Sequence, residues 1–125
     1  MTEVRFRVAV AGGVPVVEAP REIDVTNSAG LRLALLDAAS NCHKRFVVDM
    51  TRTRFCDASA SHVLAAAHVR ALEEGREMLL AVSDAAIVRR VFALTGIDRM
   101  IPSFASLEEA LVNAAADGCL PPVGS

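Results

Sequence analysis

The sequence contains no tryptophan and no tyrosine, and only three of its 125 residues are cysteine. Aliphatic side chains must therefore fill most of the core, and a hydrophobic fraction of 53% is enough to supply one domain. No apolar run approaches the roughly 20 residues that cross a bilayer, and the N-terminus lacks the apolar segment of a signal peptide. We expect a cytoplasmic protein without membrane contact.

The few cysteines have no paired spacing, which indicates reduced thiols and not a disulfide framework (Cys42, Cys56 and Cys119). Together with the three histidines they form no metal-ligand spacing, so we expect neither a metal nor another cofactor. The formal net charge of −2 is unlike that of nucleic-acid-binding proteins, which carry a basic stripe. We therefore expect no nucleic-acid partner.

Hydrophobic periodicity alternates between the period of strands and the period of helices. Strands are predicted at 4–10, 14–17, 46–50, 78–82 and, as a short last one, 100–101. Ala11-Gly12-Gly13 is typical of a hairpin turn, and Pro15 favours either an edge position or a strand that starts after it. Helices are predicted from about 28 to 41, 58 to 74, 85 to 95 and 107 to 116, the third capped by Ser83 or Asp84.

Strands that alternate with helices predict an α/β fold, with a mixed, mostly parallel sheet of about four to five strands and four helices. Residues 21–25 are interpreted as a connecting segment. We assign residues 1–118 to a single domain. Residues 119–125, which contain two prolines and a glycine, are interpreted as a loose C-terminal tail.

One stretch combines a buried strand with the start of a helix. Residues 46–50 are apolar except for Asp49, and Asp57 is a strong N-cap candidate for the alanine-rich helix that follows. Ser59 then falls in the first helical turn, where backbone N–H groups lack intrahelical partners and the helix dipole favours negative charge. A hydroxyl at this position is well placed to carry a phosphate.

Three segments together resemble a known family: the strand followed by Asp57-Ala58-Ser59-Ala60 and a helix, the segment 82–99, and Ser106-Leu107-Glu108-Glu109-Ala110-Leu111. This pattern is similar to the STAS-domain anti-sigma factor antagonists, over a match from about residue 44 to 112. The family motif reads Asp-Ser-Ser-Gly or Asp-Ser-Thr-Gly. A partner kinase, which is also the anti-sigma factor, phosphorylates the residue before the glycine.

On this chain the resemblance implies that Asp57 is the motif aspartate, Ser59 the phosphorylated residue and Ala60 the equivalent of the glycine. Ala58 replaces the first hydroxyl residue of the motif, and Ala60 adds a methyl group where a partner's backbone approaches. The residues expected to contact the partner are Asp57, Ala58, Ser59, Ala60 and His62.

The resemblance also implies the function: an anti-sigma factor antagonist with a STAS-like fold and no enzymatic activity. Such a protein binds a GHKL-type serine kinase, is switched off by phosphorylation of Ser59, and is reset by a PP2C-type phosphatase. An exposed edge of the first hairpin is compatible with a monomer or a weak dimer.

Two other functions use the same residues. The first is a phosphorylation-independent STAS interaction or scaffold module of a signalling complex, which Ala58 and Ala60 favour. The second is a small-molecule binder or hydrolase that uses Ser59 and His62, three residues apart on one helical face. A G-x-S-x-G elbow is absent, so a surface histidine is the preferred interpretation. Cys56 is expected to be buried and inert.

Overall fold

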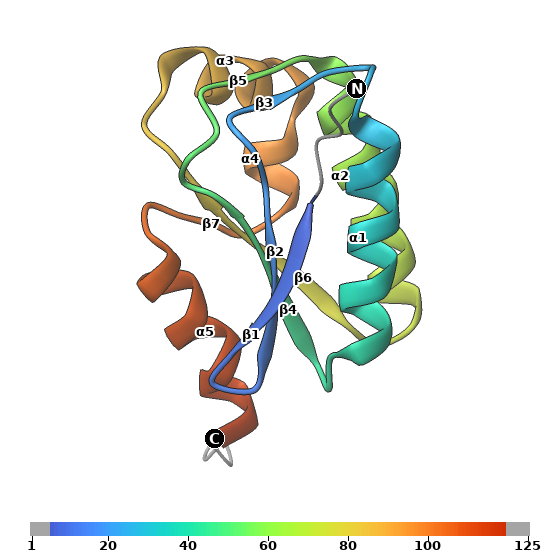
Figure 1. Cartoon of the computed structure of the whole chain (residues 1–125). Coiled ribbons are helices and arrows are strands. Elements are labelled where there is room, and N and C mark those ends of the chain that lie inside the picture. The colour runs from blue at the N-terminus through green and yellow to red at the C-terminus, as the bar shows by residue number, and fades with distance from the viewer. Residues whose placement is uncertain (1–5, 120–125) are drawn as a thin grey trace.

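A mixed sheet forms the centre of the computed structural model, which describes residues 6–119 (Figure 1). Its strand order is β1 (Arg7–Ala11), β2 (Val14–Glu18), β4 (Arg45–Met50), β6 (Glu77–Val82) and β7 (Ser103–Phe104). β1 and β2 are antiparallel, and the other neighbours are parallel. A separate parallel pair joins β3 (Glu22–Ile23) to β5 (Phe55–Cys56). The predicted fold class is confirmed.

Helices cover both faces of this sheet. They are α1 (Ser28–Asn41), α2 (Ala58–Glu73), α3 (Ala86–Thr95), α4 (Ile97–Met100) and α5 (Leu107–Cys119). α1 and α2 pack side by side on one face, and α5 covers the other (Figure 1). Because successive strand residues point to opposite faces, Phe46 and Val48 join the core under α1 and α2, whereas Val47 joins the core under α5.

The connections that follow the parallel strands gather at one end of the molecule (Figure 1). β2 leads into β3, β4 leads into β5, and β6 leads into α3. The pairing of β3 with β5 draws the first two of these connections together, and α3 packs against β5. The predicted phosphorylation loop therefore lies at the carboxyl ends of the parallel strands, where α/β sheets commonly place their functional groups.

Three large apolar residues of α2 and α3, which helical spacing in the sequence assigns to the apolar side of each helix, are instead exposed. Leu72, Ile87 and Leu94 are 52%, 43% and 77% exposed, respectively. In α2 the buried positions are Ala60, Ser61, Leu64, His68 and Ala71. Leu72 follows the last of these and so lies about 100° further around the helix. The periodicity of apolar residues correctly indicated a buried side in each helix, but the predicted side was wider than the one that is buried.

Several boundaries also differ from the prediction. The last strand is not at Met100–Ile101, because Gly96, with φ of +84°, turns the chain into α4, which contains Met100. The strand lies at Ser103–Phe104 instead. The predicted connecting segment 21–25 contains β3. The N-cap of α3 is Ala85, not Ser83 or Asp84. The Ser83 hydroxyl accepts from the N–H of Ala85, which lies before the helix, and donates to the carbonyl of Thr53.

The hairpin is confirmed, but β2 is not an edge strand, because it lies between β1 and β4. Its ladder to β4 begins at Val16, one residue beyond Pro15. α5 continues to Cys119, past the predicted end at Ala116. Of the predicted tail, residues 120–125 lie outside the described part, and the assignment of residues 1–118 to one domain stays a prediction.

Candidate functional site

The loop between β4 and β5 is anchored by buried hydroxyl groups. The side chain of Thr53 is completely buried, and its Oγ1 donates to the carbonyl of Pro20 at 2.8 Å. The carbonyl of Thr53 in turn accepts a hydrogen bond from Ser83 Oγ at 2.7 Å. The turn after β4 is thereby tied to the segment after β2 and to the end of β6. This fixes the direction in which the chain enters α2.

β3 sets the position of Asp57. The N–H groups of Arg54 and Phe55 donate to the carbonyl of Arg21 at 2.8 and 3.2 Å, and the N–H of Asp57 donates to the carbonyl of Ile23 at 3.2 Å. Backbone bonds therefore continue along the chain up to the residue before α2. The start of the helix is consequently held by a neighbouring strand that the sequence analysis did not identify.

Asp57 is the N-cap of α2, as predicted. Its Oδ1 accepts hydrogen bonds from the backbone N–H of Ser59, at 2.9 Å, and from the Ser59 hydroxyl. The carbonyl of Asp57 accepts from the N–H of Ala60 at 3.1 Å. Ser59 is half-buried in the first turn, so its hydroxyl lies at the beginning of a 16-residue helix. This is the position that the sequence analysis expected.

The other predicted contact residues divide between surface and core. Ala58 and His62 are exposed, and with Ser59 they line the accessible side of the first turn. Ala60 is fully buried and belongs to the core that contains Leu64. The expectation that the Ala60 methyl group would face an approaching partner is therefore wrong, because that methyl group points inward.

A serine–histidine pair is not formed at this site. The hydroxyl of Ser59 donates to Asp57, and His62 makes no hydrogen bond to it. Cys56 is fully buried beneath the loop, and burial, followed by the charge of Asp57, raises the pKa of its thiol to about 11. The expectation that Cys56 is buried is confirmed. Within residues 6–119 no group of three or more His, Cys, Asp or Glu side chains is placed to hold a metal ion.

Sequence reasoning missed the apolar residues at this end of the molecule. Phe55 is 38% exposed, Ile87 43% and Val25 74%. Phe55 lies on β5, Val25 follows β3, and Ile87 lies in the first turn of α3, which packs against β5. The signal was available in the alternation of β5, because a strand that buries Cys56 must turn Phe55 outward.

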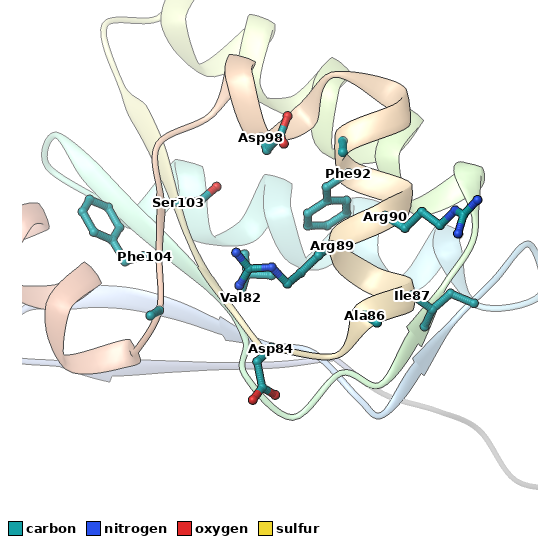
Figure 2. Close-up of a pocket in the computed structure, with 12 residues that line it drawn as sticks. Val82, Asp84, Ala86, Ile87, Arg89, Arg90, Phe92, Asp98, Ser103 and Phe104 are labelled. Atoms are coloured by element: carbon teal, nitrogen blue, oxygen red, sulfur yellow. The ribbon is translucent and has the colours of Figure 1, made fainter.

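A separate cleft lies on the other side of α3 (Figure 2). Its volume is about 1100 Å³, and it is bounded by α3, the end of β6 and β7. Arg89 extends from α3 across it toward the side of Ser103, whereas Ile87 and Arg90 point away from β7 (Figure 2). Ser59 is not among its lining residues, whereas Ile87 lies at its border.

The fold and loop define a class of small α/β domain with a hydroxyl at the start of its second helix. The family model of the STAS domain matches residues 5–110, and the chain belongs to this family. No protein of curated function matches the sequence. None of the helices within residues 6–119 has the length and apolar character that a membrane span requires.

Solved structures of several proteins are similar to this fold. An anti-sigma factor antagonist from Mycobacterium paratuberculosis is 25% identical, with a TM-score of 0.78, and the match covers 87% of this chain and 92% of that one. The unphosphorylated form of the anti-sigma factor antagonist SpoIIAA is 20% identical, with a TM-score of 0.71 and coverage of 93% and 99%. The murine anion transporter Slc26a9 is 22% identical, with a TM-score of 0.62, over 83% of this chain and 18% of the transporter.

Proposed function

We propose that this protein is an anti-sigma factor antagonist, a non-enzymatic cytoplasmic switch that binds a serine-kinase anti-sigma factor. The observation that carries this proposal is the half-buried Ser59 hydroxyl in the first turn of α2, in a chain that belongs to the STAS family. Similarity to a solved anti-sigma factor antagonist at 25% identity supports the same function. The partner is a GHKL-type kinase, which transfers a phosphoryl group to Ser59, and a PP2C-type phosphatase removes it.

The binding surface in this proposal is the loop end of the molecule. It comprises the accessible side of the first turn of α2, with Ala58, Ser59 and His62, and the exposed apolar residues Phe55 and Ile87. Exposed apolar side chains that are grouped next to polar ones are typical of protein-binding surfaces. Asp57 and Ala60 stabilise this turn: Asp57 is the N-cap of α2, and the side chain of Ala60 packs in the core.

A phosphoryl group suffices to switch such a surface off. Phosphoserine carries about −1.5 to −2 charges at neutral pH. In a protein interface that charge must be desolvated, and an acidic neighbour on the partner repels it. A loss of about 3 kcal/mol in binding free energy weakens affinity by roughly two decades. The change in charge is local to the loop, so the domain itself does not need to refold.

Two measurements test the proposal. The chain is incubated with its candidate kinase and ATP, and intact mass spectrometry is expected to show a gain of about 80 daltons, the mass of one phosphoryl group, which is absent in Ser59→Ala. Pull-downs then compare wild type, Ser59→Ala and Ser59→Glu. The alanine variant should retain the kinase and the glutamate variant should lose it, with unchanged far-UV circular dichroism in both. A glutamate variant that binds as well as wild type contradicts the switch.

A second candidate function is a phosphorylation-independent STAS interaction module. Two observations favour it: Ala58 and Ala60 replace motif residues, and the similar solved structures include a transporter in which the match covers 18% of the chain. Under this alternative the chain captures the same partner with and without ATP, no mass is gained, and Ser59→Glu binds like wild type.

A further inference from the structure

The carboxylate of Asp57 already caps the start of α2. A helix start leaves several backbone N–H groups without intrahelical acceptors, and these groups attract negative charge. Here the N–H of Ser59 donates to the Asp57 carboxylate and the N–H of Ala60 donates to the Asp57 carbonyl. A phosphoryl group on Ser59 would therefore meet a helix start at which the N–H groups of Ser59 and Ala60 already have acceptors.

Phosphorylation also removes a contact that now stabilises the loop. The Ser59 hydroxyl donates its only hydrogen to Oδ1 of Asp57. In the phosphoester this hydrogen is gone, and the oxygen that carried it bears a group with close to two negative charges. Asp57 Oδ1 and Ser59 Oγ then have no hydrogen between them. Either the carboxylate or the phosphoryl group has to turn away.

The first turn itself supplies no charge that offsets this repulsion, and the nearest arginine or lysine along the chain is the exposed Arg54, five residues before Ser59. The first turn of α2, residues 58–61, contains no basic residue. The neighbouring segment brings charges of both signs to this edge. Asp24 follows Ile23, whose carbonyl accepts from the N–H of Asp57, and the carbonyl of Arg21 accepts from the N–H of Arg54. Along α2 the one cationic candidate within a turn of Ser59 is the exposed His62.

We propose that Asp57 opposes the phosphoryl group on Ser59, so that phosphorylation loosens the first turn of α2 as well as adding charge. The inference rests on the proposed modification of Ser59 and concerns how the modified state differs from the unmodified one. The fold persists, while residues 58–61 lose part of their N-cap. A partner that docks on the ordered turn is then released by disorder and by charge together.

The test uses phosphoserine installed at position 59 by genetic code expansion, so that no kinase is needed. It is placed in wild type, in Asp57→Asn and in Asp37→Asn, each in a His62→Gln background that removes the neighbouring imidazole. Asparagine keeps the N-cap acceptor and can donate to the phosphoryl group. Asp37 is an exposed acid in α1 and serves as the matched control. Thermal unfolding and amide hydrogen exchange are measured for each phosphorylated and unmodified pair.

Phosphoserine shifts the Tm in each chain. We expect this shift to be about 4 °C more destabilising in wild type than in Asp57→Asn. The Asp37→Asn pair should behave like wild type. Exchange at the amides of Ser59 and Ala60 should speed up at least about tenfold on phosphorylation in wild type, and much less in Asp57→Asn. Equal Tm shifts in these two chains, or unchanged exchange in wild type, would overturn the proposal.

A second readout needs no variant at Asp57. Phosphorus NMR measures the second pKa of phosphoserine 59 in the folded chain and in urea, and we expect the folded value to be the higher one. A folded value at or below the urea value would contradict the opposition by Asp57. Failure of the proposed function is distinguishable, because a chain that no kinase modifies can still show this coupling, and a chain without the coupling can still be modified.

Discussion

The hydroxyl groups of Ser61 and Thr95 are hydrogen-bonded at 2.9 Å, which joins the first turn of α2 to the last turn of α3. Thr95 Oγ1 also lies 2.7 Å from the carbonyl of Val91. A carbonyl only accepts, and a threonine hydroxyl has one hydrogen. Thr95 therefore donates to Val91, and Ser61, which is 2% exposed, donates to Thr95.

This assignment predicts an asymmetry between two variants. Thr95→Val should lower the free energy of unfolding by about 1–3 kcal/mol, because the buried Ser61 hydroxyl loses its acceptor. Ser61→Ala should cost less, about 1 kcal/mol, because Thr95 keeps its bond to Val91. Urea denaturation measures both, and Ser40→Ala, which removes an exposed hydroxyl, is the control with an expected change within about 0.5 kcal/mol. The opposite order would contradict the assigned donor.

A buried histidine makes the fold sensitive to acid. His68 is 7% exposed in α2, and its Nδ1 is buried without a hydrogen-bond partner. Burial lowers the pKa of His68 below its ordinary 6.5, against a smaller opposing effect of Glu77. Below about pH 6.5 the unfolded chain therefore binds more protons than the folded one, and the free energy of unfolding decreases as the pH is lowered.

The matched pair for this prediction is His68→Leu and His62→Gln, a buried and an exposed histidine of the same helix. Urea denaturation is measured at pH values from about 7.5 to about 5, which bracket the ordinary histidine pKa of about 6.5. The free energy of unfolding should decrease less over this range in His68→Leu than in wild type. His62→Gln should follow wild type more closely. Because the slope is compared and not the absolute stability, a packing change at position 68 does not affect the result. Parallel curves for His68→Leu and wild type would contradict it.

The buried thiol of Cys56 predicts a loss of stability at high pH. Its pKa is raised, mainly by burial, from 9.0 to about 11 in the folded state. As pH rises from about 9 toward 11, the unfolded chain loses its thiol proton first, so the free energy of unfolding falls, by about 2–3 kcal/mol in total. Few other groups change charge in this range, because the chain has no tyrosine and a single lysine.

Cys56→Ala should flatten this decline, as measured by urea denaturation at pH values of about 8 and about 10.5, which lie on either side of the ordinary thiol pKa of 9.0. Cys42 is the control, because burial also raises its pKa, but by less. Its alanine variant should keep more of the alkaline decline than Cys56→Ala does. An unchanged decline in Cys56→Ala would show that the thiol is not responsible.

Much of the fold could be predicted because local patterns agree with it. The runs 46–50 and 78–82 are apolar because both faces of β4 and β6 are covered, and the structure confirms them as strands. Gly75 and Gly96 follow the ends of helices and have positive φ, the conformation in which glycine commonly ends a helix. The two-residue strands β3 and β5 could not be predicted, since two residues carry no periodicity and these strands exist through their pairing with each other.

The candidate site likewise has some features that the local sequence determines and others that tertiary packing determines. The N-cap role of Asp57 and the place of Ser59 in the first turn are local properties, set by side-chain hydrogen bonding over two residues. The burial of Ala60 and the exposure of Phe55 and Ile87 depend on what packs against each element. Sequence patterns therefore located the hydroxyl but did not identify the apolar surface beside it.

The chain alone determined the order of the longer strands and helices, the α/β class and the residue that opens α2, because each follows from spacing and capping within a few residues. Tertiary structure decided what supports that residue. The bond from Asp57 to Ile23 and the bond from Ser61 to Thr95 each join positions far apart in the chain. Such contacts are set by how the sheet and helices assemble in space, and no local pattern of residue types encodes them.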